Sequence, residues 1–240
     1  MRLSILLSLF ASITYADLIV LSTGDSVSTA VGTRLGFEID LLPSITPDFV
    51  GDTEQTWLGN DYSYQGYGGF RFEHMLTGTS NQDGLTDALT RYSPEVITIL
   101  GGYNDVAGEA SMASIEADLD ALVDYGFAHS SAIILVANVT TFRYGWAHKQ
   151  PRVIEWNSTL LSNINARRAA GQQIGYIDNF SEIGPESTAA DGLHLNGRGA
   201  ITAGRNWFPV WQPMSIPEPS AFTLLAVLGA ALSITRKVKQ

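Results

Sequence analysis

Short apolar runs alternate with segments of helical spacing along this chain, and that alternation constrains its fold more than any other feature. Runs rich in β-branched residues predict buried strands at 18–23, 96–100, 133–139 and 174–177. A weaker strand is expected around Phe49 and Val50. Apolar residues three and four apart predict helices around 31–42, 115–123 and 153–164. Such a βαβ series predicts one α/β domain of three layers (α/β/α), built around a flavodoxin-like, five-stranded parallel sheet.

The N-terminus has the pattern of an export signal. Arg2 precedes an apolar stretch at 3–13, and the small-residue pattern Thr14-Tyr15-Ala16 follows it. We therefore expect residues 1–16 to be a signal peptide. A buried first helix is the alternative, but the strand-like run that follows at once argues against it.

The C-terminus has the pattern of a sorting tail. Pro217-Glu218-Pro219 precedes an uncharged apolar run at 221–235 and then a basic end. This order resembles the PEP-CTERM signal of Gram-negative bacteria, which implies an exosortase as partner and delivery to the cell surface or extracellular matrix. The basic end favours at least transient membrane insertion of a short helix, and an ordinary membrane anchor is the alternative. Both place an exported domain at 17–213 and a tail at 214–240.

The composition excludes several kinds of site. Lys and Arg number 14 against 24 Asp and Glu, so a net charge of −10 repels polyanions and argues against a nucleic-acid partner. There is no cysteine, which excludes disulfides, thiolate metal sites and a cysteine nucleophile. The four histidines lack metal-binding spacing, so we expect neither a metal nor another cofactor.

The first predicted strand ends in the sequence TGDS at 23–26. A serine on the turn from a buried strand into a helix has its hydroxyl at the edge of the sheet, where ligands bind. Ser26 is therefore a candidate nucleophile, and an ordinary helix cap is the alternative. We expect the neighbouring Asp25, like Asp105 further along, to accept hydrogen bonds from loop amides and to be structural.

A candidate hydrogen-bond donor follows the next buried run. The sequence continues there as GGYND at 101–105. Because a flavodoxin-like order puts the end of this strand beside the first one, the Asn104 amide is placed to stabilise negative charge that develops next to Ser26. A glycine-rich turn with asparagine in a local backbone role is the alternative.

A candidate base lies after the last predicted strand. Asp191 precedes His194 by three residues, in the sequence DGLH. On a tight turn, this spacing lets the carboxylate bind one imidazole nitrogen while the other nitrogen points away. The pair has the relation that a catalytic base has to the group that orients it, and an ordinary surface turn is the alternative.

The order of Ser, Gly, Asn and Asp-x-x-His at successive strand ends resembles the SGNH hydrolases, the group that includes the GDSL lipases and esterases. The resemblance implies that Ser26 is the nucleophile, that His194 is the base and that Asp191 orients it. It also implies an oxyanion hole formed by the Ser26 amide, the Asn104 side chain and a glycine amide. No cofactor is implied.

The glycine of that oxyanion hole comes from the sequence QGYGGFR at 65–71. The family glycine precedes a short polar or aromatic residue and a helix, so we choose Gly69, with Gly68 as the alternative. The same segment, with FVG at 49–51, resembles carbohydrate esterase family three. Departures from that family include Tyr64-Gln65, where the family has a His-Glu pair.

Aromatic residues are concentrated in the segments expected to surround the site, and flat rings of this kind suit a glycan ligand. They are Trp57, Tyr62, Tyr64, Tyr67, Phe70, Tyr103, Phe142, Tyr144 and Trp146. We therefore expect an exported serine esterase that removes short acyl groups, above all acetyl groups, from a polysaccharide. The alternatives are a GDSL-type lipase, lysophospholipase or thioesterase, or a glycan-binding surface protein without catalysis.

Overall fold

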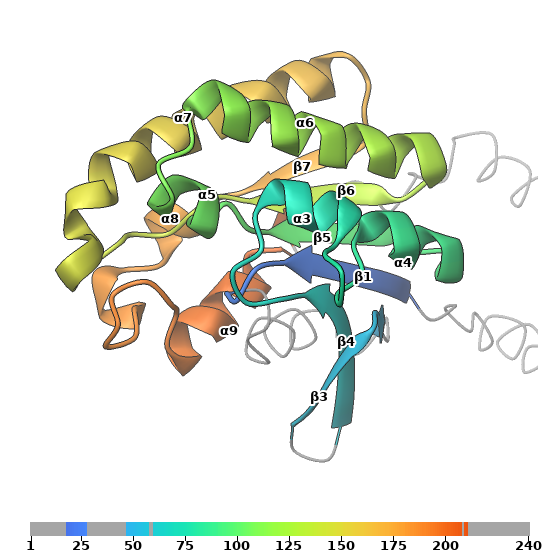
Figure 1. Ribbon diagram of the computed structural model, residues 1–240, viewed down its shortest axis with the longest axis horizontal. Helices are drawn as coiled ribbons and strands as arrows, with labels where there is room; N and C mark the ends of the chain where they lie inside the picture. Colours follow the sequence, from blue (N-terminus) through green and yellow to red (C-terminus); the bar gives the residue numbers. More distant parts are fainter. Residues whose placement is uncertain (1–17, 28–46, 58–59, 208, 211–240) are drawn as a thin grey trace, which may run out of the picture.

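Five parallel strands form the centre of the molecule in the computed structural model, which describes residues 18–27, 47–57, 60–207 and 209–210. These strands are β1 (Leu18–Gly24), β2 (Pro47–Val50), β5 (Val96–Leu100), β6 (Ile133–Ala137) and β7 (Ile174–Ile177). Their order across the sheet is β2-β1-β5-β6-β7 (Figure 1). The expected flavodoxin-like order is therefore confirmed, because the second strand lies on one side of β1 and the later strands follow on the other.

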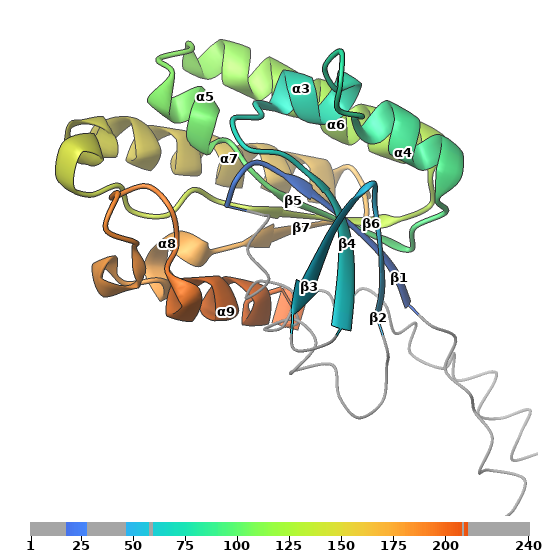
Figure 2. The same ribbon diagram turned by 60° about the horizontal axis from the view of Figure 1, so that its bottom comes forward.

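A hairpin extends this sheet beyond the five strands expected from the sequence. β3 (Thr53–Trp57) and β4 (Asn60–Gly66) pair antiparallel, and the end of β4 runs parallel to the end of β1. The described sheet therefore has seven strands. The sequences TEQTW and NDYSYQG gave no strand prediction because they lack the apolar run of a strand buried on both faces. Figures 1 and 2 show the hairpin projecting from the rest of the sheet.

The two longest described helices cover the sheet with the apolar positions that the sequence spacing predicts. α6 (Met112–His129) and α7 (Gln150–Ala169) share one side of the sheet (Figure 1). The residues that they bury include Ile115, Leu119, Leu122, Val123, Val153, Leu160 and Ile164. Two apolar residues of the predicted pattern, Ile154 and Leu161, are exposed instead, because the buried stripe of α7 runs through Trp156 and Asn157.

Shorter helices complete the two outer layers. α3 (Phe72–Thr77), α4 (Leu85–Arg91) and α5 (Tyr103–Ala107) lie on the same side of the sheet as α6 and α7. Figure 2 shows α8 (Asn179–Glu182) and α9 (Gly197–Arg205) on the opposite side. Two short 3₁₀ helices, η1 (Tyr144–Lys149) and η2 (Pro185–Ser187), occupy the connections. The α/β fold with helices flanking a largely parallel sheet is thus as expected.

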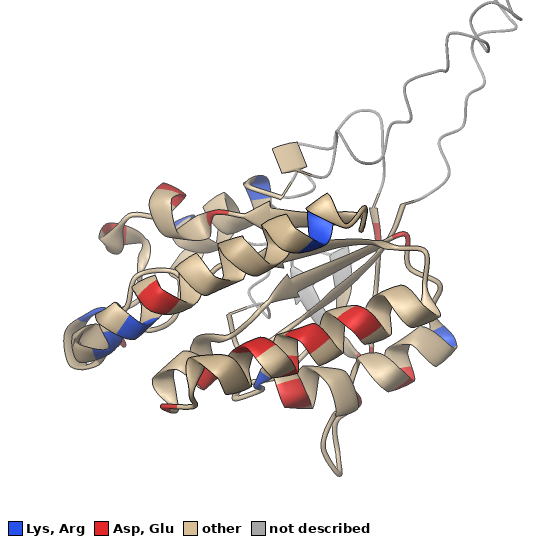
Figure 3. Cartoon of the chain, turned by 90° about the horizontal axis from the view of Figure 1, so that it is seen from above, with Lys and Arg blue, Asp and Glu red and all other residues tan. Residues whose placement is uncertain are grey.

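Acidic residues recur along α6 (Figure 3). Arg167 of α7 donates hydrogen bonds to Asp120 and to Asp124, the latter at 2.6 Å. Asn163, one turn before Arg167, also donates to Asp120 at 2.9 Å. Hydrogen bonds between polar side chains therefore join α6 and α7 outside the apolar core.

Three sequence predictions lie outside the described residues: the signal peptide at 1–16, the helix around 31–42 and the tail at 214–240. Within the part of the chain that the structure describes, no helix combines the length and the apolar character that crossing a membrane requires.

Candidate active site

β1 and β5 end side by side and bring the segments that follow them to one edge of the sheet. Gly24 lies opposite Leu100 in the ladder, and the Asp25 amide continues the pairing by donating to the Leu100 carbonyl at 3.3 Å. Ser26 therefore leaves the sheet next to the segment that carries Asn104, as the strand order predicts. This edge is the carboxyl end of the parallel strands, the usual ligand edge of such a sheet.

Ser26, His194 and Asp191 form a continuous hydrogen-bonded array. Ser26 Oγ lies 2.7 Å from His194 Nε2, and His194 Nδ1 lies 2.7 Å from Asp191 Oδ2. An ionised carboxylate only accepts, so Nδ1 carries the proton and Nε2 presents its lone pair to the serine hydroxyl. The arrangement can take a proton from Ser26, which is the requirement for a serine nucleophile at neutral pH.

The Asp191 carboxylate is held ionised by its own turn. Partial burial alone would raise its pKa, but hydrogen bonds from the Leu193 amide, the His194 side chain and the His194 amide outweigh burial and lower the pKa. The two amides bind Oδ1 at 2.9 and 3.0 Å, which leaves Oδ2 for the imidazole. The side chains of His194 and Asp191 are 39% and 50% exposed, so the site is open to solvent.

Gly192 allows this turn to pack against the loop that follows β6. Its φ is +79°, and a Cβ there would stand 2.3 Å from the carbonyl oxygen of Arg143. The Arg143 amide donates to the Gly192 carbonyl at 2.8 Å. Only glycine fits both the left-handed backbone and the close approach, so its position between Asp191 and His194 is explained.

Asn104 lies in the first turn of α5, where it faces the glycine-rich loop. Gly102, with a φ of +91°, turns the chain from β5 into this helix. The Asn104 Nδ2 donates to the Phe70 carbonyl at 2.9 Å. An amide nitrogen has two hydrogens, so this bond uses one of them and Asn104 remains a candidate donor.

The glycine-rich loop is a tight turn attached to β1. The Tyr67 amide donates to the Gly24 carbonyl at 3.3 Å, and the Phe70 amide donates to the Tyr67 carbonyl at 3.2 Å. Gly69, at the third position of this turn, has a φ of +85°, which favours glycine. Gly68 and Gly69 are exposed, and neither amide donates to another described residue. Both glycines remain candidate donors.

Two buried carboxyl groups support the segments that carry Ser26 and Asn104. Burial, with the nearby Asp105 charge, raises the pKa of Asp25 to about 7, although hydrogen bonds from the Val27 and Tyr103 amides oppose the rise. Burial likewise raises the pKa of Asp105 to about 6. The Asp25 carboxyl group thus accepts hydrogen bonds from backbone amides of both segments, from Val27 at 2.9 Å and from Tyr103. It is the structural acceptor that the sequence predicts.

Four of the nine aromatic residues expected around the site are buried. Phe70, Tyr103 and Phe142 are buried in the core, and the Tyr103 hydroxyl is used by Thr140. Tyr64 is also buried. The expectation of an aromatic rim is therefore wrong for these four rings, whose side chains pack inside the protein. Tyr144, by contrast, is 60% exposed.

Gln65, one of the departures from carbohydrate esterase family three, has a structural environment. It is buried at the end of β4, where its Oε1 accepts from the Asp52 amide at 3.1 Å and its Nε2 donates to the Asp83 carbonyl at 2.8 Å. The side chain joins two loops. The side-chain amide both donates to and accepts from backbone groups, so Gln65 has a structural role in this fold.

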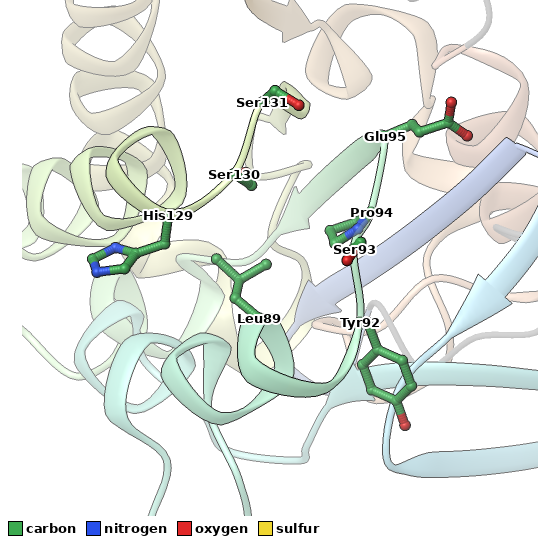
Figure 4. Close-up of a pocket in the computed structure, with 8 residues that line it drawn as sticks. All are labelled: Leu89, Tyr92, Ser93, Pro94, Glu95, His129, Ser130 and Ser131. Carbon is green, nitrogen blue, oxygen red and sulfur yellow. The ribbon is translucent and has the colours of Figure 1, made fainter.

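A cavity of about 310 Å³ lies at the other end of the sheet. Figure 4 shows its lining at the starts of β5 and β6, with Tyr92, Glu95 and His129 among the residues. Glu95 Oε2 already accepts from the Ile19 amide at 3.1 Å. This cavity is separate from Ser26, which follows the carboxyl end of β1. Among the described residues, no cluster of three or more His, Asp or Glu could hold a metal ion.

The fold and the family match identify a carboxylic ester hydrolase of the SGNH type. The chain belongs to the GDSL-like Lipase/Acylhydrolase family, which matches residues 23–200. No curated protein matches the sequence significantly.

Several solved structures share the fold at low sequence identity. The family 3 carbohydrate esterase of Clostridium thermocellum has a TM-score of 0.68 and 18% identity, over 83% of this chain and 97% of that one. A carbohydrate esterase family 3 protein from Talaromyces cellulolyticus has a TM-score of 0.66 and 18% identity, over 82% and 98%. A catalytic mutant of an acetylxylan esterase from Geobacillus stearothermophilus has a TM-score of 0.56 and 13% identity, over 83% and 94%.

Proposed function

We propose that this protein is an exported serine esterase that removes short acyl groups, above all acetyl groups, from a carbohydrate. The observation that carries the proposal is the hydrogen-bonded array Ser26–His194–Asp191, with both links at 2.7 Å. A nucleophile, a base and an orienting carboxylate in this geometry suit acyl transfer through a covalent intermediate.

In the first half of the reaction, Ser26 Oγ attacks the ester carbonyl while His194 Nε2 accepts its proton. The carbonyl oxygen becomes an oxyanion, which the Ser26 amide, the Asn104 side chain and the Gly69 amide stabilise, with Gly68 as the alternative donor. The tetrahedral intermediate collapses as His194 protonates the departing alkoxide. The sugar hydroxyl leaves, and the acyl group stays on Ser26.

In the second half, His194 takes a proton from water, and the resulting hydroxide attacks the acyl-serine. The same oxyanion donors stabilise the second intermediate. Collapse releases the carboxylic acid and returns the proton to Ser26. This cycle uses only side chains and backbone amides of the chain, and Asp191 stays ionised throughout because its pKa is low.

Two observations support a small acyl group on a carbohydrate. The side chains of His194 and Asp191 are well exposed, so the site is accessible to a polymer. The three structures cited above are carbohydrate or acetylxylan esterases by name. Export is proposed from the N-terminal signal pattern, and surface delivery from the PEP-CTERM-like tail, which an exosortase would process.

The test compares 4-nitrophenyl acetate, butyrate and decanoate as substrates of the purified protein, with Ser26→Ala as the control. We expect acetate to be hydrolysed fastest and Ser26→Ala to lose the activity while keeping the thermal midpoint of the parent. Faster hydrolysis of decanoate would support a lipase instead. Full activity in Ser26→Ala would refute the nucleophile, and no hydrolysis of any ester would support a binding protein.

A further inference from the structure

Tyr144 is an exposed aromatic residue in an unfavourable backbone conformation. Its side chain is 60% exposed, and its φ is +50°. A left-handed conformation is disfavoured by about 1–2 kcal/mol for a residue with a Cβ, and burial of the ring does not compensate for it here. Strain at an exposed position is typical of functional sites.

The surrounding hydrogen bonds hold this conformation firmly. The Arg143 amide binds the Gly192 carbonyl at 2.8 Å, and the Trp146 amide binds the Arg143 carbonyl at 2.9 Å. The Arg143 guanidinium also donates to the carbonyl of Pro185. Tyr144 thus follows a residue, Arg143, whose backbone and side chain both bind the segment that precedes His194.

The Tyr144 ring lies directly beside the turn of the candidate base. Its Cδ2 is 3.0 Å from the point where a Cβ of Gly192 would stand. Gly192 follows Asp191 and precedes His194 by two residues. A group that contacts the Tyr144 ring is therefore adjacent to the site in which Ser26 and His194 meet.

Arg143 gives the ring a polar neighbour. Its guanidinium carbon lies 4.8 Å from the centre of the Tyr144 ring. The guanidinium lies over one face of the ring, so a sugar would pack its C–H groups against the opposite face or the ring edge and turn its hydroxyl groups toward Arg143. Pro185 takes one of the five guanidinium N–H groups, so others remain for sugar hydroxyls, and a plain acyl chain would not use them.

We propose that Arg143 and Tyr144 form a saccharide subsite, which binds a sugar unit next to the one that carries the ester. The proposal rests on the esterase function proposed above and names a place where the polymer is held. The rigid turn presents the ring without a loss of backbone entropy on binding, which favours affinity. Tyr144 then determines preference for a polymer over a small ester.

The test uses Tyr144→Asn, because asparagine tolerates a left-handed backbone and removes only the ring. Tyr144→Trp keeps an aromatic ring, and Ile154→Ala removes a comparably exposed apolar side chain on α7, away from the site. The substrates are acetylated xylan, acetylated glucomannan and 4-nitrophenyl acetate. Thermal midpoints verify that each variant is folded.

We expect Tyr144→Asn to raise KM on an acetylated polysaccharide by roughly 5- to 10-fold, the effect of one lost ring contact. Its kcat/KM on 4-nitrophenyl acetate stays within about 2-fold of the parent, because the ring does not touch the reacting atoms. Tyr144→Trp and Ile154→Ala retain the parental KM. Equal losses on polymer and small ester, or no loss on either, would overturn the subsite.

Binding to the Ser26→Ala protein separates the subsite from the reaction. Isothermal titration with each of the two polysaccharides should show binding that Tyr144→Asn weakens by a similar factor. If the parent protein hydrolyses no ester but the Ser26→Ala protein shows this Tyr144-dependent binding, the esterase proposal fails and the subsite stands. If neither polysaccharide binds while 4-nitrophenyl acetate is hydrolysed, the subsite fails and the esterase stands.

Discussion

The side-chain amide of Asn104 donates a hydrogen bond to the carbonyl oxygen of Phe70 at 2.9 Å. This contact joins the first turn of α5 to the loop that carries Gly68 and Gly69. It fixes the rotation of the amide, so the second N–H is oriented before any ester arrives. A donor that needs no reorganisation stabilises developing charge more effectively than a mobile one.

Asn104→Ala should lower kcat on 4-nitrophenyl acetate by about 10²–10³-fold with little change in KM, because an oxyanion donor acts chiefly in the transition state. Steady-state kinetics test this prediction. With 4-nitrophenyl acetate as the varied substrate, the KM of Asn104→Ala should stay within about 2-fold of the parental KM. A large rise in KM with an unchanged kcat would show that Asn104 binds the ground state instead.

Asp191→Asn should keep the turn, since the amide oxygen still accepts from the Leu193 and His194 amides. It removes the carboxylate that fixes the imidazole tautomer, so kcat/KM should fall by about 10³–10⁴-fold. The thermal midpoint, measured by circular dichroism, should change little. Activity close to that of the parent would exclude Asp191 from the reaction.

Gly69→Ala and Gly68→Ala test how far the turn and the activity depend on the left-handed backbone of Gly69. Neither new methyl group meets a heavy atom within 4 Å, so clashes do not affect the comparison. The left-handed φ of +85° belongs to Gly69 alone of the two. We expect alanine at Gly69 to shift the turn and lower kcat by roughly 10-fold or more, and alanine at Gly68 to change it by less than about 3-fold. The reverse order of effects would contradict an active turn that depends on the left-handed backbone of Gly69.

The stability of the protein should fall as the pH rises from about 4 to 7. The pKa of Asp25 rises from 3.8 to about 7 on folding, so across this window the folded state keeps a proton that the unfolded chain has lost. The resulting decrease in the free energy of unfolding is at most about 1.4 kcal/mol per pH unit for one group. Asp105, whose pKa rises to about 6, acts in the same direction.

Asp25→Asn should make this pH dependence shallower, because the uncharged amide does not titrate. Urea unfolding at several pH values from 4 to 8 measures the slope, and Asp48→Asn on β2 serves as an exposed control. Identical slopes for Asp25→Asn and the parent would contradict a carboxyl group that is protonated in the folded state.

The central strands could be predicted because they are apolar on both faces. β5 and β7 have the predicted bounds, and β1 and β6 differ from them only at their ends. The β3–β4 hairpin could not be predicted from the same signal, since its residues are mostly polar. α9, with the sequence GRGAITAGR, also could not be predicted, because the residues that it buries are glycines and alanines and not large apolar side chains.

The convergence of Ser26 with His194 follows from topology, because parallel strands deliver their carboxyl ends to one edge. The orientation of side chains in the loops does not follow from topology. Phe70, Tyr103 and Phe142 are aromatic residues that could stack on a sugar, yet their side chains are buried in the core. The Tyr144 side chain is exposed. Whether such a ring is buried or exposed depends on the path of its segment. That path depends on contacts such as the hydrogen bond between Arg143 and Gly192.

Asp191 and His194 belong to one short turn, whereas Ser26 lies 168 positions earlier than His194. The Asp191–His194 hydrogen bond can form whenever the turn forms. Ser26 reaches His194 only when the paired strands from β1 to β7 are in register. A slip of one strand by two residues moves its end by about 7 Å, far beyond hydrogen-bond reach. Hydrolysis of an ester would therefore indicate that the strands are aligned correctly. Molecules with a misaligned strand would have no esterase activity.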